Sequence, residues 1–560
     1  MSNPNSNVAF LLRRNAQERP NTLAVKTPVS VGPEGEIAHD TLTFSELDRR
    51  TDAAARFLRA AGIGPGTRTL LALKPGASLI TGLYALLKVG AVPIALDPGM
   101  GRKQALACVE RTQPTALLGT RRAYWLSHLP LRALKTLKTR VNVESRDWSE
   151  AVEVAPSNLP DSFHRAEEND LAAILFTSGS TGTPKGVCYT HGMLAAQVQL
   201  IRSTYGLGPG DIDFPLLPAF SLFNPALGAT TVAPLMDPAH PAAADPDVLL
   251  AALRQEGATS SFGSPTLWDI LARAAEARGL RLPALRFILT AGAPVPPGLL
   301  ARLKRLAPNA AIHTPYGATE CLPVSTIESQ EILTETSTAT RQGQGTCVGK
   351  PVTGVEIRII RPHPGVLAHL EEATACTVGQ VGEVVVTGTT VTREYDRLPE
   401  ATRAAKTQDA TGRTWHRMGD LGALDVRGRL WFHGRGVEQL HTAEGDLTTE
   451  SIEPAFADHP QVRRCALIGL GSAGQHLPIL VVEARSFPAR ALEAENLAAE
   501  LRQHAALNPL ALKVQRIVFQ RSLPVDRRHN AKIHRLTLTR HWSSRPFPSE
   551  AECDDHNYET

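Results

Sequence analysis

The sequence predicts an α/β fold: a large N-terminal domain of mostly parallel sheets with flanking helices, and a smaller, mobile α+β domain at the C-terminus. Strand-like and helix-like patterns alternate through the first 120 residues and again from residue 171, which is typical of parallel strands joined by helices. A second alternation begins near residue 436 and runs for about 100 residues, the size of a separate domain. We therefore expect domains over residues 1–435 and 436–542 and a flexible tail over 543–560.

Local signals place the individual elements. Thr43 and Glu46 have the spacing of a helix capping box, apolar residues then recur at helical intervals, and Gly62 ends the helix. A polar, aperiodic stretch between residues 145 and 168 predicts a surface loop. The other predicted elements are strand-like runs at 69–73, 92–96, 116–118, 171–176, 285–289, 429–432, 464–468, 479–482 and 516–519, and helices at 78–89, 101–111, 451–457 and 491–505.

Composition excludes several classes of protein. The chain has 560 residues with 59 Lys and Arg against 55 Asp and Glu, dispersed along its length, whereas a nucleic-acid binder concentrates basic residues on one face. The most apolar stretch, residues 69–96, is interrupted by Lys74 and Lys88 and does not predict a membrane span. Seven widely spaced cysteines without a CxxC pair, and a polar N-terminus unlike a secretory signal, predict a cytoplasmic protein with reduced thiols.

A polyphosphate-binding loop is predicted directly after the strand at 171–176. Three glycines in residues 177–186 allow a tight turn that brings backbone N–H groups close to an anion, and five hydroxyl groups supply further donors. Pro184 stands where the Walker motif requires glycine, so the loop is of another type. The predicted phosphate-binding residues are Thr177, Ser178, Gly179, Ser180, Thr181, Gly182 and Lys185.

Further motifs, in a fixed order between about residues 42 and 536, resemble the adenylate-forming superfamily of acyl-CoA synthetases, peptide-synthetase adenylation domains and luciferases. Besides the phosphate loop, these motifs are Ala291–Pro294, Tyr316–Glu320 (Y-G-x-T-E in the superfamily), Gly382-Glu383, Trp415–Asp420 and Gly434-Arg435. The resemblance implies that the protein uses ATP to activate a carboxylate as an acyl adenylate and releases pyrophosphate.

The resemblance also implies a role for each motif. Glu320 is expected to bind Mg²⁺, for which a carboxylate is a suitable hard oxygen ligand, and Asp420 to accept two ribose hydroxyl protons. ATP and Mg²⁺ are therefore the expected cofactors. The remaining implied contacts are Gly292, Ala293 and Pro294 beside the adenine, Tyr316 and Gly317 against its ring, Thr319 on a phosphate and Arg435 at the start of the hinge.

The last motif resembles the superfamily's C-terminal P-x-T-x-x-G-K-I, whose lysine reaches the carboxylate and the α-phosphate. Here the interval from Pro524 to Lys532 is two residues longer, and Ala531 replaces the glycine. We still expect Lys532 to be catalytic, because an ammonium group on a long side chain can follow charge that moves between carboxylate and phosphate. The alternative is a solvated surface lysine. Only 12 of the 59 basic residues are lysine, and Lys185 and Lys532 are two of them.

Three departures from the superfamily concern segments that bind a thiol acceptor. Ser221 stands in the place of a histidine, Val437 replaces the hinge Asp or Lys, and the loop at 439–445 lacks I-K and shifts its glycine by one residue. These departures indicate an acceptor other than coenzyme A. The pattern resembles the β-lactone synthetases of bacterial long-chain olefin biosynthesis on residues 97–102, 221–225, 235–238 and the H-N-A-K at 529–532.

This second resemblance implies a 2-alkyl-3-hydroxyalkanoic acid as substrate, whose own 3-hydroxyl group displaces AMP and closes a β-lactone. An internal nucleophile needs no second substrate site. His191, His313 and His433 are candidate bases for the hydroxyl proton, with structural packing as the alternative for each. The alkyl pocket implied by the superfamily comprises residues 220–225, 262–265 and 291–295.

Two other functions remain open at this point. A long-chain fatty acyl-CoA synthetase or a fatty acyl-AMP ligase would share the adenylation step and use another acceptor. A non-catalytic nucleotide-binding protein would be expected to have lost Glu320, Asp420 or Lys532, and all three are present. The expected partner is thus a small molecule, a long-chain 3-hydroxy acid, and assembly with other enzymes of the olefin pathway follows from the resemblance alone.

Overall fold

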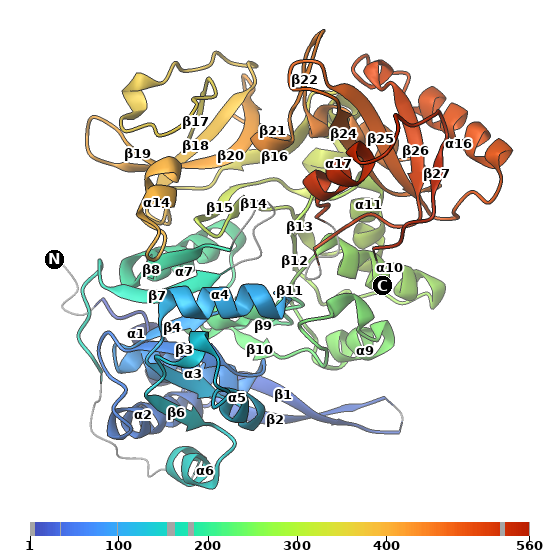
Figure 1. The fold of residues 1–560 in the computed structure, drawn as a ribbon. Coiled ribbons are helices and arrows are strands. Elements are labelled where there is room, and N and C mark those ends of the chain that lie inside the picture. The colour runs from blue at the N-terminus through green and yellow to red at the C-terminus, as the bar shows by residue number, and fades with distance from the viewer. Residues whose placement is uncertain are drawn as a thin grey trace.

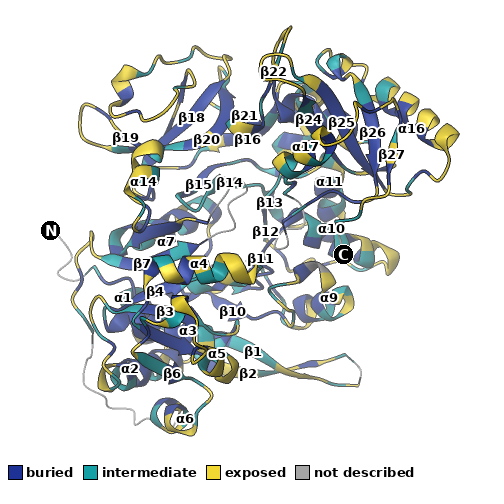
Figure 2. Cartoon of the chain, viewed as in Figure 1, coloured by how far each residue is buried: buried dark blue, intermediate teal, exposed yellow. Residues whose placement is uncertain are grey.

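The computed structural model describes residues 6–33, 35–97, 99–153, 163–176, 184–526 and 532–558. In Figure 1 the chain up to Arg435 forms the lower part of the molecule and its upper left, and the later residues form a separate part at the upper right. Figure 2 shows that the strands are the most deeply buried elements and that many helices expose one face. Two parallel-rich sheets with flanking helices and a separate C-terminal α+β region confirm the predicted fold class.

The first sheet contains six strands in the order β6-β5-β3-β4-β7-β8. All neighbours are parallel except β7 and β8, so the carboxyl ends of the first five strands meet at one edge of the sheet. Apolar runs predicted four of these strands, β3, β4, β5 and β7, and most of their residues are buried. Its strands are β3 (Arg68–Ala72), β4 (Val92–Ala95), β5 (Ala116–Gly119), β6 (Thr139–Asn142), β7 (Leu171–Phe176) and β8 (Gly186–Thr190).

The second sheet contains seven strands in the order β13-β12-β11-β9-β10-β1-β2. Its pairs are parallel except for the antiparallel pair of β1 and β2. The largest buried cluster of apolar residues lies against this sheet and includes Trp268, Phe214 and Leu300. The strands are β1 (Leu23–Val31), β2 (Ile37–Thr43), β9 (Ile212–Asp213), β10 (Thr230–Val232), β11 (Ser260–Gly263), β12 (Phe287–Thr290) and β13 (Ala311–His313).

The third sheet is antiparallel in every strand pair among the described residues, which the sequence patterns did not predict. Its main path runs β14-β15-β16-β21-β20-β18-β17, and β19 pairs with β20. It carries four of the sequence motifs, at 316–320, 382–383, 415–420 and 434–435. The strands are β14 (Tyr316–Ala318), β15 (Cys321–Thr326), β16 (Thr346–Pro351), β17 (Val355–Ile360), β18 (Gly382–Gly388), β19 (Lys406–Gln408), β20 (Thr414–Leu424) and β21 (Leu430–Arg435).

After Arg435 the chain forms a short hairpin and a sheet in the order β24-β25-β26-β27. Its apolar core includes Phe456, Leu501 and Phe519 and is separate from the core of the second sheet. The hairpin strands are β22 (Leu440–Thr442) and β23 (Gly445–Leu447), and the sheet strands are β24 (Val462–Leu470), β25 (Leu477–Ala484), β26 (Arg516–Gln520) and β27 (Cys553–Asp554).

The tail predicted at 543–560 is packed against this sheet over its described part, so that prediction is wrong there. β27 pairs in parallel with β26. The Asp554 carboxylate is buried and lies 2.6 Å from Nε2 of His541 and 3.1 Å from a guanidinium nitrogen of Arg545. The Pro, Ser and acidic composition of the segment is typical of a tail, but the pairing partner of β27 lies more than 30 residues earlier in the chain and leaves no local signal.

Helices cover the sheets and confirm most of the predicted boundaries within one or two residues. The predicted capping box is present at the start of α2, where Thr43 and Glu46 exchange hydrogen bonds. The helices are α1 (Phe10–Glu18), α2 (Phe44–Ala60), α3 (Ala77–Lys88), α4 (Arg102–Thr112), α5 (Arg121–Leu126), α6 (Arg146–Glu153), α7 (His191–Tyr205), α8 (Asn224–Leu227), α9 (Pro246–Gln255), α10 (Pro265–Ala277), α11 (Pro297–Leu306), α12 (Ser329–Glu331), α13 (Ser337–Arg341), α14 (Pro399–Ala405), α15 (Glu453–Ala457), α16 (Ala491–His504) and α17 (Arg535–Ser543).

Helix α6 occupies residues 146–153, so the surface loop predicted between residues 145 and 168 is wrong there, while residues 154–162 lie outside the described ranges. Trp148 and Val152 are four residues apart, lie on one face of the helix and are buried. The Trp148 ring packs edge-on against Phe57 of α2, with 5.4 Å between ring centres. Two apolar residues among polar ones are too few to give a periodic pattern, although burial of a tryptophan is enough to hold the helix in place.

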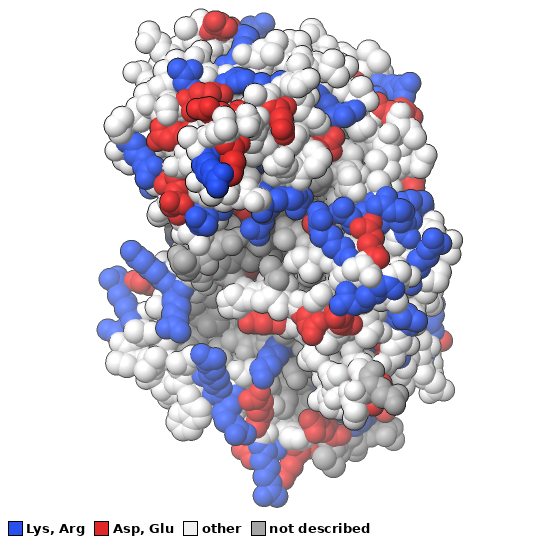
Figure 3. All heavy atoms as spheres, turned by 90° about the vertical axis from the view of Figure 1, so that its right-hand side faces the viewer, with Lys and Arg blue, Asp and Glu red and all other residues white. Residues whose placement is uncertain are grey.

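The bulk features expected from composition can be compared with the structure. All seven cysteines are free, and five of them are buried. Within the described ranges, no helix combines the length and apolarity needed to cross a membrane. On the face shown in Figure 3, basic and acidic side chains are interspersed over most of the surface.

Candidate active site

A large cavity lies between the N-terminal sheets and the C-terminal part of the chain. Its volume is about 2160 Å³, against roughly 300–1,000 Å³ for an ordinary small-molecule site. Figure 3 shows a hollow in the surface between the upper and lower parts of the molecule. The predicted site residues that line the cavity are Lys185, Gly292, Ala293, Pro294, Tyr316, Gly317, Thr319, Glu320, Asp420, Arg435 and Lys532. Every described residue of the predicted site is therefore at one cavity, while the individual roles stay predictions.

The predicted phosphate loop lies mostly outside the described residues. This applies to Thr177, Ser178, Gly179, Ser180, Thr181 and Gly182. Phe176 at the end of β7 and Lys185 just before β8 both line the cavity. The Pro184 carbonyl accepts a 2.7 Å hydrogen bond from Arg111 of α4. Both sides of the loop are thus at the cavity, at the sheet edge where nucleotides bind in open α/β sheets.

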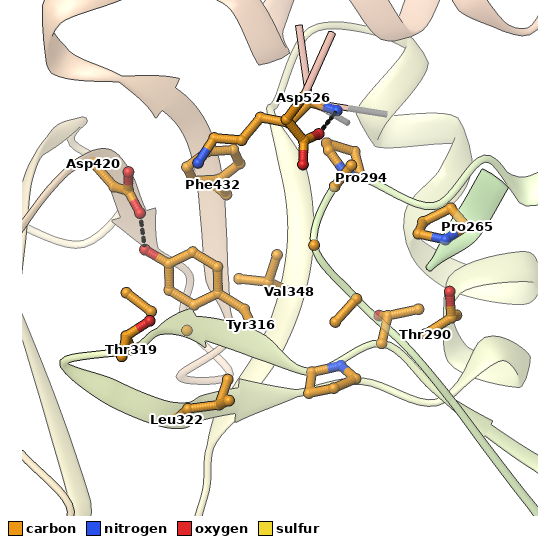
Figure 4. Close-up of a pocket in the computed structure, with 18 of the residues that line it drawn as sticks. Pro265, Thr290, Pro294, Tyr316, Thr319, Leu322, Val348, Asp420, Phe432 and Asp526 are labelled. Atoms are coloured by element: carbon orange, nitrogen blue, oxygen red, sulfur yellow. Dashed lines mark hydrogen bonds between the residues drawn. The ribbon is translucent and has the colours of Figure 1, made fainter. Parts of the chain in front are cut away.

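Tyr316 and Asp420 meet across the third sheet, and Figure 4 shows the tyrosine side chain extending to the carboxylate. The Tyr316 hydroxyl donates a 2.5 Å hydrogen bond to Oδ2 of Asp420, and a guanidinium nitrogen of Arg435 lies 2.7 Å from Oδ1. Burial raises the pKa of Asp420, while Arg435 and the Tyr316 hydroxyl act in the opposite direction. Two motifs 104 residues apart therefore form one polar wall of the cavity.

The Thr319-Glu320 pair forms the turn between β14 and β15. The conformation of this hairpin depends on Gly317, where an added Cβ would lie 2.6 Å from the Cys321 carbonyl oxygen. The Tyr189 hydroxyl donates a hydrogen bond to the Thr319 carbonyl and anchors the turn to β8. The turn places both residues at the cavity wall. The Y-G-x-T-E motif therefore corresponds to a β-hairpin.

Glu320 is held as a carboxylate by its neighbours. Burial acts to raise its pKa, but His416, the Tyr395 hydroxyl and Lys406 together lower the pKa below its usual value. The Tyr395 hydroxyl donates a 2.6 Å hydrogen bond to Oε1 of Glu320. A charged oxygen donor on the cavity wall fits the requirements of Mg²⁺, which usually binds one or two carboxylates together with substrate phosphates. No cluster of three or more potential ligands exists among the described residues, so the phosphates would have to complete the coordination.

Three residues around Glu320 were missed by the sequence interpretation. Tyr395 and His416 line the cavity, and the Lys406 ammonium lies 5.9 Å from the centre of the Tyr395 ring. The Lys406 ammonium is buried, which lowers its pKa to about 8, and it donates a 3.2 Å hydrogen bond to Thr392. Burial likewise lowers the pKa of His416 to about 3. His416 lies inside the motif at 415–420, and Lys406 is one of only 12 lysines. Because lysine is rare in this chain, Lys406 could have been considered as a site residue from the sequence.

Lys532 reaches the cavity from the C-terminal part of the chain. Val525 and Ile533 form an antiparallel bridge beside this residue, and Asp526 hydrogen-bonds the Lys532 backbone in both directions, at 3.0 and 3.1 Å. Burial lowers the pKa of the Lys532 ammonium, while Asp420 and Asp526 counteract the effect. The lysine is therefore not the solvated surface residue of the alternative interpretation.

The segment after Lys532 connects this residue to the rest of the C-terminal part. Arg535 forms two hydrogen bonds with the Glu453 carboxylate, at 2.5 and 2.8 Å, and one with Glu438, at 3.1 Å. Glu438 lies three residues after Arg435, in the first turn after β21. The segment that carries Lys532 is thus joined by a buried ionic network to the start of the C-terminal part.

The far end of the cavity is apolar. The Phe220 ring packs against Phe262, with 4.0 Å between ring centres, and lies 6.4 Å from Phe223. All three rings line the cavity. Segments 220–225, 262–265 and 291–295, predicted to form an alkyl pocket, each contribute lining residues. The cavity therefore has an apolar wall against which a hydrocarbon chain can pack.

None of the three predicted histidine bases lines the cavity. Nδ1 of His191 accepts a 3.3 Å hydrogen bond from the Val8 backbone, and burial lowers the pKa of this histidine to about 4. His313 packs against Tyr205, and His433 lies 3.3 Å from the Thr448 hydroxyl. All three have structural surroundings, which agrees with the structural packing stated as the alternative for each.

Ser221, which replaces a histidine of thiol-using relatives, makes a local contact. Its hydroxyl donates a 2.6 Å hydrogen bond to the Pro218 carbonyl within the same turn, and the residue is buried. It therefore offers neither a base nor a free hydroxyl group to the cavity.

The profile of the AMP-binding enzyme family matches residues 12–396, which is more than half of the chain and includes the phosphate loop, Tyr316 and Glu320. The chain belongs to this family. It is an AMP-forming ligase. This agrees with the cavity, which is lined by both polar and apolar residues. Activation with ATP is the reaction shared by such adenylate-forming enzymes.

Two curated relatives are similar along nearly their whole length. The olefin beta-lactone synthetase of Stenotrophomonas maltophilia is 42% identical over 557 residues, which cover 97% of this chain and 99% of the relative. The olefin beta-lactone synthetase of Xanthomonas campestris pv. campestris is 42% identical over 547 residues, covering 95% and 96%. Both matches extend past residue 396 into the part that carries Lys532.

Solved structures share the fold. The anthranilate CoA ligase AuaEII in complex with anthranoyl-AMP superposes with a TM-score of 0.79 at 20% identity, covering 96% of this chain and 98% of that one. ATP-bound MatB from Rhodopseudomonas palustris gives a TM-score of 0.77 at 21% identity, covering 96% and 99%. At these identities the likeness concerns the fold alone.

Proposed function

We propose that this AMP-forming ligase converts a 2-alkyl-3-hydroxyalkanoic acid and ATP into a β-lactone, AMP and pyrophosphate. A carboxylate oxygen first attacks the α-phosphorus of ATP and displaces pyrophosphate. The 3-hydroxyl oxygen then attacks the acyl carbon, its proton is released and AMP leaves. The observation that carries the proposal is the 42% identity over 97% of the chain to a protein named olefin beta-lactone synthetase.

The polar end of the cavity suits the adenylation step. In the proposal, Tyr316, Gly317 and the segment 292–294 contact the adenine, and Asp420 accepts the ribose hydroxyl protons. Arg435 holds the Asp420 carboxylate in place through the 2.7 Å contact. Lys532, which Asp526 positions, neutralises the charge that develops between the carboxylate and the α-phosphate.

Glu320 would hold Mg²⁺ together with phosphate oxygens, and Thr319 and Lys185 would contact the phosphates alongside the loop at 177–182. When bound, Mg²⁺ neutralises phosphate charge and so assists the departure of pyrophosphate. The contribution of the chain is to keep Glu320 ionised and oriented, which the Tyr395 hydroxyl does through its 2.6 Å hydrogen bond.

The apolar end suits an acceptor that belongs to the substrate itself. The rings of Phe220, Phe223 and Phe262 provide an environment that excludes water from a hydrolysable adenylate. Ser221 is bound to Pro218, and no thiol-activating histidine stands in its place. An internal hydroxyl group held beside the acyl carbon gains the proximity that a second substrate would otherwise have to provide.

The proposal includes how the chain is divided and where it works. Residues 1–435 hold the nucleotide and the acyl chain, and residues 436–542 deliver Lys532 as a mobile unit. Location in the cytoplasm and assembly with other enzymes of olefin synthesis are proposed by similarity to the relatives, and co-purification with such enzymes would test the assembly.

One experiment separates this function from its alternatives. The purified protein is incubated with Mg-ATP and a synthetic 2-alkyl-3-hydroxy acid, with and without coenzyme A, and the products are identified. A lactone and AMP formed without coenzyme A support the proposal. A thioester formed only with coenzyme A would indicate an acyl-CoA synthetase, and absence of nucleotide turnover with any carboxylate would indicate a binding protein.

A further inference from the structure

Exposed apolar side chains gather on α5 and the turn that follows it. None of the six residues of α5 is buried. Trp125 is 66% exposed and Leu126 51%, and they are followed within five residues by Leu129 at 47% and Leu131 at 37%. Isolated exposed apolar residues are common on protein surfaces, but a tryptophan with three leucines in a row of seven residues marks a binding surface.

The same segment carries positive charge alone. Residues 121–138 contain five of the 59 basic residues of the chain and none of its 55 acidic residues. All five basic side chains are exposed, and they are Arg121, Arg122, Arg132, Lys135 and Lys138. The charge of this short segment exceeds the net charge of +4 of the whole chain. Only Arg132 forms an ion pair within the described part of the molecule, with Glu110 at 2.7 Å.

The topology places this surface on the side of the sheet where the cavity opens. α5 directly follows β5 and packs beside β5 and β6 (Figure 1). Because β5, β3, β4 and β7 are parallel, the end of β5 is at the same sheet edge as the ends of β4 and β7, where Leu96 and Phe176 line the cavity. β5 is two strands from β4, a distance of about 10 Å at the usual strand spacing.

We propose that residues 121–138 form a docking surface for the face of an anionic lipid bilayer. Trp125, Leu126 and Leu129 would enter the region between headgroups and acyl chains, and the Arg and Lys side chains would contact lipid phosphates. A protein partner fits less well, because the cores of protein interfaces are depleted in lysine, and the cations of this patch outnumber the carboxylates that contact it, those of Glu110 and Glu144. Its position beside the cavity suits a ligase that takes a long-chain acid, and that link to the substrate rests on the proposed function.

The test is co-sedimentation of the purified full-length protein with vesicles, in the absence of ATP and substrate. Vesicles of phosphatidylcholine alone are compared with vesicles that also contain phosphatidylglycerol, at low and at high salt. We expect binding to the anionic vesicles that decreases with salt. Trp125→Ser with Leu126→Ser should weaken binding by about tenfold or more, and Arg122→Gln with Lys135→Gln by about fivefold for each charge removed.

The matched control is Leu492→Ser with Arg490→Gln on the distant helix α16, where Leu492 is also 66% exposed. It should bind vesicles like the parent protein. Vesicle binding that is equal with and without phosphatidylglycerol, or unchanged in both α5 variants, would overturn the proposal. A parent protein that binds neither kind of vesicle would also overturn the proposal. If, in addition, the oligomeric state differs between the parent and the α5 variants, the surface is a protein contact instead. Since no turnover is measured, the outcome is independent of the proposed reaction.

Discussion

The hydroxyl group of Tyr395 donates a 2.6 Å hydrogen bond to the carboxylate of Glu320, the residue proposed to bind Mg²⁺. The Lys185 ammonium lies 4.8 Å from the centre of the Tyr395 ring, and the Lys406 ammonium 5.9 Å. One tyrosine thus contacts the carboxylate through its hydroxyl group and two cations through its ring. This residue connects the proposed metal ligand with the lysine of the phosphate loop.

Tyr395→Phe should slow adenylation, because it removes the hydrogen bond to Glu320 and keeps the ring that faces the lysines. A hydrogen bond to a charged group contributes about 1.5–3 kcal/mol, which corresponds to a rate loss of roughly ten- to a hundredfold. ATP–pyrophosphate exchange measures the step directly. Tyr124→Phe, outside the cavity, is the control, and an unchanged exchange rate in Tyr395→Phe would show that the contact is only structural.

Removal of Mg²⁺ with a chelator should stop ATP–pyrophosphate exchange, and added Mg²⁺ should restore it. Glu320→Gln keeps the size of the side chain but removes its charge, so we expect the Mg²⁺ concentration for half-maximal exchange to rise about tenfold or more. Glu328→Gln, a nearby residue that does not line the cavity, serves as the control. The same Mg²⁺ requirement in the parent and in Glu320→Gln would place the metal ligand elsewhere.

Lys532→Ala should abolish adenylate formation while ATP still binds. Loss of a preorganised charge at the reacting centre typically costs roughly a hundred- to a thousandfold in rate, whereas the nucleoside contacts of Tyr316 and Asp420 stay intact. Nucleotide binding is followed by calorimetry and adenylation by pyrophosphate release. Lys513→Ala, also in the C-terminal part, provides the comparison, and full activity of Lys532→Ala would refute the assignment.

Glu450 gives the molecule a pH-dependent stability that substitution should remove. Burial, followed by the charge of Glu453, raises the pKa of Glu450 to about 7, although it accepts a 2.6 Å hydrogen bond from Thr346. A carboxyl group with a raised pKa binds its proton more tightly when folded, so its contribution to stability is present at acidic pH and is lost as the pH rises through 7.

Glu450→Gln should therefore stabilise the protein above pH 7 by up to about 3 kcal/mol and have little effect near pH 4.5. Chemical denaturation at several pH values measures the difference. Glu444→Gln, whose side chain is exposed, should show no such pH dependence. A difference between Glu450→Gln and the parent that is constant with pH would mean that folding does not shift the pKa of Glu450.

Local signals predicted most elements because they depend on residues close together in the chain. The capping box of Thr43 and Glu46 and the left-handed Gly62 are examples, and both are present. The site motifs were also local, and every described residue predicted to belong to the site lines the cavity. The wrong predictions concern elements that depend on contacts between distant segments. β27 pairs with β26, and Trp148 of α6 packs against Phe57 of α2. The same holds for Tyr395 and Lys406, whose importance comes from Glu320, which is 75 residues before the tyrosine.

The network of Arg535 with Glu438 and Glu453 has a consequence for how the protein can move. Since Arg535 is three residues after Lys532 and is bound to the first turn after the third sheet, the position of the lysine is tied to that turn. A rotation of the C-terminal sheet about a point before Glu438 would carry the lysine and this network together. A crosslink that fixes this sheet in another orientation should leave the fold of the N-terminal sheets intact and stop the step proposed for Lys532.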